Sequence, residues 1–200
     1  MDRKQLEGAG AAYTYLRGLI GIPAGLMMVL AALGNWRIPP LDIDAVFLAV
    51  LLAIALTTLP ILRYYNEHYG RVRPTAKQDR LTVLLTVLAV PVVLGGSLLL
   101  RSRASWSLDL PVNPVAIGIA LMGLISYAIG LGLKGHHVII WGGLLVIGAL
   151  PVWKGADPSN IGLLLAGLVV ILNGALDHRL FVRIFGPAGA LESEDSDAGA

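Results

Sequence analysis

The side chains best suited to chemistry in this sequence are four histidines, each of which follows or precedes another histidine or a carboxylate. The candidate residues are Glu67, His68, His136, His137, Asp177 and His178. Imidazole and carboxylate groups are common ligands for zinc and similar metals, and histidine also titrates near physiological pH. A metal site or a catalytic acid–base site would therefore be built from these six residues.

The spacing of these residues, however, matches no metal-binding motif such as H-E-x-x-H. Adjacent residues on a helix point in different directions, so His136 and His137 are not expected to share a ligand. We therefore expect the six side chains to lie apart, as solvated groups at a membrane surface. The sequence predicts no bound metal, no cofactor and no catalytic residue.

Sequence motifs for other kinds of catalysis or ligand binding are also absent. The sequence contains no phosphate-binding loop, no dinucleotide-binding glycine motif, no G-x-S-x-G nucleophile elbow and no cysteine. Asp42 and Asp44 have the D-x-D spacing of some divalent-ion sites, but Asp44 is better explained as the N-cap of the helix that follows. A short basic cluster is expected to contact anionic lipid headgroups rather than nucleic acid. That cluster comprises Arg71, Arg73, Lys77 and Arg80.

The elements that carry these residues are predicted from the composition, which is 56% apolar and 14% charged with a mean hydropathy of +0.75. About a quarter of the residues in soluble domains are charged, so this chain is predicted to be an integral membrane protein. A spanning helix needs roughly 20 apolar residues. Six segments meet or approach that length, namely 18–34, 45–62, 81–100, 114–133, 138–152 and 161–176.

None of the six segments contains a charged residue, and Asp177 and His178 directly follow the sixth. The fifth and sixth segments are short, so four spans with a re-entrant pair are the alternative to six. The first segment is interpreted as an uncleaved span rather than a signal peptide, because it is longer than a typical signal core. Small residues and prolines predict helix packing at Gly21 and Gly25 and a kink or cavity at Pro23, Pro60 and Pro91.

The distribution of lysine and arginine predicts the orientation, because short loops rich in these residues stay in the cytoplasm. With six spans and the N-terminus inside, only four basic residues fall outside, which are Arg37, Arg101, Arg103 and Lys154. Eleven fall inside, which are Arg3, Lys4, Arg17, Arg63, Arg71, Arg73, Lys77, Arg80, Lys134, Arg179 and Arg183. Both termini are therefore predicted to be cytoplasmic.

The predicted fold is an all-α membrane bundle of six helices in three hairpins with short loops over residues 1–186, followed by a disordered acidic tail over 187–200. Frequent arginine, alanine and glycine favour a bacterial inner membrane. The function expected is that of an accessory, assembly or sensor module acting through helix contacts. The alternatives are a small transporter or channel for a neutral or apolar solute, and a membrane enzyme with a cytoplasmic histidine and carboxylate site. The expected partners are the lipid bilayer and a second copy or another membrane protein, with no nucleic acid.

Overall fold

The computed structural model describes residue 13 and residues 15–69, 111–130, 132–153 and 158–185. Every element in these ranges is a helix, and they contain no strand, so the predicted helical class is confirmed there. The elements are η1 (Gly18–Ile20), α2 (Gly21–Asn35), α3 (Asp44–Leu56), α4 (Thr58–His68), α6 (Pro114–Gly130), α7 (Gly135–Ala149) and α8 (Pro158–Phe185).

Three helical stretches among the described residues are long and apolar enough to cross a membrane, by length and composition. They are Gly18–Asn35, Asp44–His68 and Asn160–Phe185, while α6 and α7 are shorter apolar helices. The sixth predicted segment is therefore not short, since α8 continues through Asp177 to Phe185. The predicted segment 81–100 with Pro91, and the predicted tail 187–200, lie outside the described residues.

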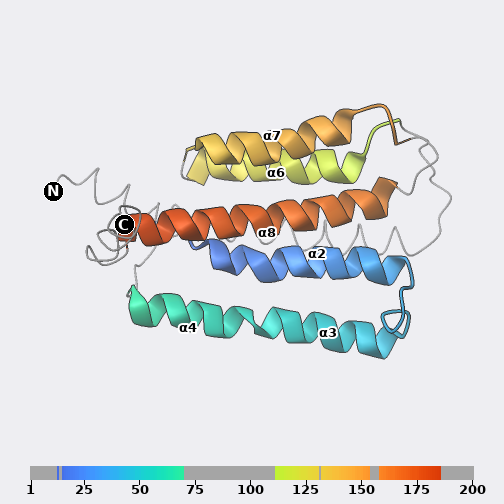
Figure 1. Cartoon of the computed structure of the whole chain (residues 1–200), viewed down its shortest axis with the longest axis horizontal. Helices are drawn as coiled ribbons and strands as arrows, with labels where there is room; N and C mark the ends of the chain where they lie inside the picture. Colours follow the sequence, from blue (N-terminus) through green and yellow to red (C-terminus); the bar gives the residue numbers. More distant parts are fainter. Residues whose placement is uncertain (1–12, 14, 70–110, 131, 154–157, 186–200) are drawn as a thin grey trace, which may run out of the picture.

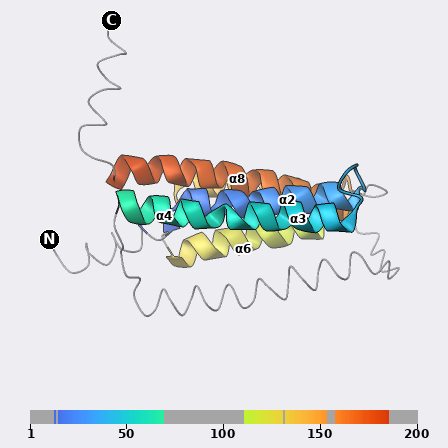
Figure 2. The same ribbon diagram turned by 90° about the horizontal axis from the view of Figure 1, so that it is seen from below.

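The helices lie side by side along the long axis of the molecule (Figures 1 and 2). The end of α4, the end of α6, the start of α7 and the end of α8 meet at one end of the bundle, at the left of Figure 1. We call this the histidine end, because α4, α7 and α8 bring all four histidines there. The 36–43 connection and the ends of α7 and α3 nearest to it lie at the opposite end.

The most extensive packing is between α2 and α8, which are far apart in the sequence. A Cβ atom added to Gly25 would lie 2.6 Å from the carbonyl oxygen of Gly167, and one added to Gly167 would lie 2.7 Å from that of Gly25. Gly18 and Gly174 meet in the same reciprocal way two turns along. By contrast, a Cβ on Gly21 would stay 3.9 Å from its nearest neighbours. The close approach thus depends on glycines seven residues apart, of which Gly25 is one and Gly21 is not.

The prolines have local explanations. Pro23 lies in the first turn of α2, where its missing N–H costs no hydrogen bond. The long helical stretch Asp44–His68 is interrupted at Thr57, one turn before Pro60, where the Thr57 hydroxyl donates to the Ile54 carbonyl over 2.6 Å. At the start of this stretch the N-cap is Ile43 and not Asp44, so that prediction was wrong; Asp44 is the first helical residue, where a carboxylate still favours the helix dipole.

In the described residues many large apolar side chains are exposed, whereas several polar side chains are buried. Large aliphatic side chains face outward, and Leu48, Leu52 and Leu59 on α3 and α4 are all more than half exposed. The fully or nearly fully buried set includes four polar side chains, Asn113, His137, Asn173 and Asp177. Such an arrangement suits an apolar solvent, in which outward-facing leucines cost nothing and polar groups must find partners inside.

Candidate functional site

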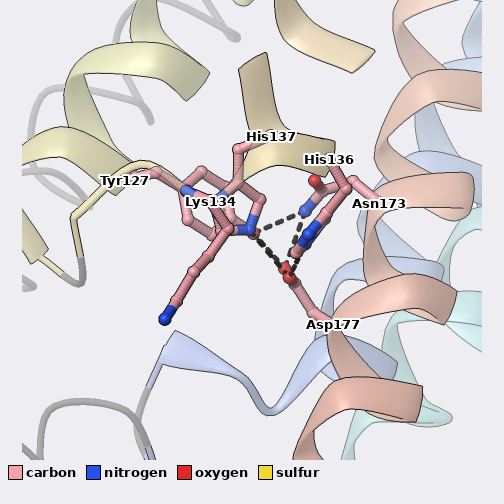
Figure 3. Close-up of polar contacts among 6 residues, drawn as sticks. All are labelled: Tyr127, Lys134, His136, His137, Asn173 and Asp177. Carbon is pink, nitrogen blue, oxygen red and sulfur yellow. Dashed lines mark hydrogen bonds and ion pairs between the residues drawn. The ribbon is translucent and has the colours of Figure 1, made fainter. Parts of the chain in front are cut away.

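The polar core of the histidine end is built around the carboxylate of Asp177, which is fully buried on α8. Its Oδ1 accepts hydrogen bonds from two imidazoles, with the Nε2 atoms of His136 and His137 at 2.9 and 2.8 Å. Its Oδ2 accepts from the Tyr127 hydroxyl at 2.5 Å and from the Asn173 amide at 2.8 Å. Figure 3 shows these side chains converging from three helices on one carboxylate.

The two histidines reach the same oxygen because they lie in the first turn of α7. Side chains in a helix tilt toward its N-terminus, so two rings from the first turn can extend past the helix end to one point. Their ring centroids are only 4.0 Å apart. The prediction that the candidate residues lie apart is therefore wrong for His136, His137 and Asp177, since one potential ligand atom from each lies within 4.8 Å of the others.

A backbone contact assigns the proton on His137. The N–H of Lys134 donates to Nδ1 of His137 over 3.3 Å, so Nδ1 carries a lone pair and Nε2 carries the proton. Nε2 is then the donor to Asp177. The same bond ties the residue preceding α7 to its first turn.

Tyr127 from α6 and Asn173 from α8 complete the site. The Asn173 amide donates to the Tyr127 hydroxyl at 2.6 Å as well as to Asp177, and the Tyr127 ring lies 3.8 Å from that of His137, measured between centroids. Asn173 and Asp177 are one turn apart and share a helix face. That i, i+4 spacing of an amide and a carboxylate on an apolar helix was the available sequence signal, because both must be buried against a partner.

The charge of Asp177 is offset by neighbours other than lysine or arginine side chains. Within the described ranges its close contacts with His136 and His137 are hydrogen bonds from the rings, and the His137 ring is neutral because its Nδ1 accepts from Lys134. The Lys134 side chain points away from the cluster (Figure 3). The N-terminus of α7 adds the positive end of its helix dipole beside the carboxylate. Four donors and a dipole thus surround a carboxylate that has no exposed surface.

His178, the neighbour of Asp177, belongs to a second cluster at the histidine end. Its Nδ1 lies 2.8 Å from the hydroxyl of Tyr65, which also accepts a hydrogen bond from the N–H of Leu19 at 3.3 Å. Tyr65 is packed edge-on to Phe181, and the Arg17 guanidinium lies 4.3 Å from the Tyr13 ring centroid. This cluster joins η1, α4 and α8 through aromatic packing.

The remaining two candidates are separate from both clusters. Glu67 and His68 are exposed at the end of α4, and Nδ1 of His68 lies 3.0 Å from the Tyr64 carbonyl oxygen of its own helix. The six candidates therefore divide into a converging group of three, of which His137 and Asp177 are buried, a bridging His178 and an exposed pair.

The chain has no significant match among protein-family models, curated proteins or solved structures. The chemistry of the site must be argued from its own atoms. Two imidazole nitrogens and one carboxylate oxygen form a donor set that suits a first-row transition metal. In the metal-free protein the same atoms share protons, so the group acts as a hydrogen-bonded junction between α6, α7 and α8.

Proposed function

We propose that this chain is a multi-pass membrane protein that works as an accessory, assembly or sensor module through contacts between helices. It crosses a bacterial inner membrane six times with both termini in the cytoplasm, so the histidine end faces the cytoplasm. The apolar outward faces of α3, α4 and α8 support the membrane location. The basic residue Arg63 lies on α4, and Arg17 and Lys134 directly precede η1 and α7; these three residues support the orientation.

The observation that carries the proposed function is a pair of open glycines on α7. A Cβ atom added to Gly142 or Gly143 would meet none of the described atoms within 4 Å, whereas one added to Gly25 or Gly148 would lie against neighbouring atoms. Small residues allow another helix to approach closely, and close packing is what holds helices together in lipid. Gly142 and Gly143 therefore provide a surface that a second membrane helix can occupy.

The test is to purify the full chain from its native membrane in mild detergent and to measure its mass and its stoichiometric partners. We expect a dimer or a complex with another membrane protein. Replacing both glycines in Gly142→Leu/Gly143→Leu should abolish the association while the monomer stays folded, because a Cβ atom at either position has none of the described atoms within 4 Å.

The matched control is Ile139→Leu on the same helix, since Ile139 is 75% exposed and the substitution keeps its size. The control should associate as the wild type does. A strictly monomeric wild-type chain with no stoichiometric partner would overturn the proposal, and equal association of all three proteins would exclude α7 as the contact surface.

A second candidate function, a membrane enzyme acting at its cytoplasmic face, is favoured by the meeting of His136, His137 and Asp177. The carboxylate in this group already accepts four hydrogen bonds, so it is poorly placed to act as a free general base. An enzyme at this position would need a bound metal to supply the reactive group.

A further inference from the structure

We propose that His136, His137 and Asp177 form a binding site for a divalent transition-metal ion such as Zn²⁺. The three ligand atoms lie within 4.8 Å of one another and come from two helices that pack together. Nitrogen from two imidazoles and oxygen from one carboxylate is a donor set typical of zinc and its neighbours in the first transition row. Calcium and magnesium prefer several oxygen ligands and suit this set poorly.

The geometry needs only a small adjustment to hold an ion. Both Nε2 atoms lie 2.8–2.9 Å from Asp177 Oδ1 because protons now join them. Ligands bound at about 2.0–2.2 Å in a tetrahedral arrangement are separated by roughly 3.3 Å, so the rings would move outward by about half an ångström. The ion would replace the Nε2 protons and keep the same three side chains together.

The surroundings of the site fit this role in two ways. Tyr127 and Asn173 hold Oδ2 of Asp177, which leaves Oδ1 directed at the histidines, and such outer partners orient metal ligands in proteins. His137 and Asp177 are fully buried, whereas the His136 side chain is 25% exposed and offers a route for entry. Three protein ligands also leave a position for water, as in zinc sites that are open to exchange.

Metal binding would also change the start of α7. An ion on Nε2 of neutral His137 requires the ring proton to sit on Nδ1, where it would face the N–H of Lys134. The Lys134 hydrogen bond must then break, which frees the residue before α7. The site therefore links the presence of the ion to the conformation of the α6–α7 connection.

The experiment uses the full chain in detergent or nanodiscs, stripped of metal, and titrated with Co²⁺ as a spectroscopic probe and with Zn²⁺ as competitor. We expect visible d–d absorption typical of nitrogen and oxygen coordination, saturating at one ion per chain and lost when Zn²⁺ is added. His136→Gln should weaken binding by more than the roughly 10–100-fold that loss of an outer partner costs. The exposed His68→Gln is the matched control and should bind as the wild type does.

Two further results separate a metal site from a purely structural junction. His136→Gln leaves the His137–Asp177 bond in place, so the metal-free variant should keep its helix content while losing the Co²⁺ spectrum. Zn²⁺ should accelerate amide hydrogen exchange at Lys134 in the wild type and leave it unchanged in the variant. The absence of a Co²⁺ spectrum in the wild type, or equal affinity in the wild type and His136→Gln/His137→Gln, would overturn the proposal. Neither outcome depends on whether the chain has a helix-binding partner.

Discussion

At the scale of single residues, the carboxylate of Asp177 holds together groups from α6, α7 and α8. Each of its oxygens accepts two hydrogen bonds, so the four donors use about all the acceptor capacity that a carboxylate has. A buried ion of this kind adds little net stability over an apolar core, but removing its charge while its partners remain is costly. Asp177 is thus expected to be more sensitive to substitution than any exposed acid.

We predict that Asp177→Asn lowers the stability of the chain by about 2–4 kcal/mol. An asparagine amide has one acceptor oxygen and one donor nitrogen. Whichever way it lies, its nitrogen faces either the two imidazole donors or the Asn173 amide, and a donor meets a donor. Thermal or denaturant unfolding in detergent measures the effect.

The matched control is Asp42→Asn, because Asp42 is exposed at the opposite end and the same change of charge costs nothing there. Coincident unfolding curves for the two variants would mean that the carboxylate does not stabilise the junction.

Three members of this site could be identified as candidates from the sequence, but their convergence on one point could not be predicted. His136, His137 and Asp177 were all among the candidates, because histidine and aspartate are rare in so apolar a chain. Their convergence depends on where α7 begins and on which face of α8 turns inward, and a pattern of adjacent histidines contains neither fact. Tyr127 and Asn173 are not among the candidates, since a tyrosine or an asparagine in an apolar helix has many structural explanations.

At the scale of elements, the packing of α2 on α8 depends on which glycines lie against the backbone of the other helix, and a short glycine motif does not identify them. Gly21 and Gly25 satisfy the G-x-x-x-G pattern, yet only Gly25 lies against the backbone of α8. The partner of Gly25 in that contact is Gly167 on α8, and the next close contact along the pair is made by Gly18 and Gly174. A sequence pattern identifies small residues on a helix, but the crossing point is set by the second helix, which lies far away in the chain.

We predict that Gly25→Ala and Gly21→Ala, two substitutions identical in chemistry, differ in effect. The new methyl group at position 25 would lie 2.6 Å from a backbone oxygen that cannot move aside alone, so α2 and α8 must separate at a cost of about 1–3 kcal/mol. At position 21 the nearest atoms are 3.9 Å away, and alanine improves helix propensity by up to about 1 kcal/mol. Unfolding in detergent should place the two variants on opposite sides of the wild type.

Equal destabilisation by both substitutions would indicate that the whole G-x-x-x-G face contacts α8. The helical class itself was predictable, because a continuous apolar run of this length has the length of a spanning helix, which satisfies its backbone hydrogen bonds within one segment. The ends of the helices were not. The α8 helix continues nine residues past Leu176, since Leu180 and Phe181 pack into the aromatic cluster and compensate for the polar residues that a hydropathy pattern treats as a boundary.

At the scale of the whole molecule, the two ends of the bundle carry different groups, although the net charge of the chain is only +2. The histidine end carries the Asp177 site, the aromatic cluster and Lys134, while the opposite end carries the 36–43 connection with Asp42. In the orientation proposed above, the histidine end faces the cytoplasm, so an ion or partner recognised there would come from the cytoplasm. This assignment and the number of spans can be tested together.

The chain contains no cysteine, so single cysteines can be introduced without background labelling. Lys134 and Asp42 are exposed at opposite ends, and we predict that Asp42→Cys reacts with a membrane-impermeant maleimide on intact cells. Lys134→Cys should react only after the membrane is permeabilised. Reversed labelling of the two positions would invert the orientation.

The same measurement decides whether residues 81–100 cross the membrane. With six spans, Ala76→Cys is protected in intact cells and Ser102→Cys is labelled, because the two positions lie on either side of that predicted segment. Protection of both would mean that the segment does not cross; the described helices after it would then reverse their direction relative to those before it. The two described halves are packed together with the ends of α4 and α8 at the same end of the bundle. Because α4 finishes at the histidine end and α6 starts at the opposite end, we expect labelling of Ser102→Cys alone.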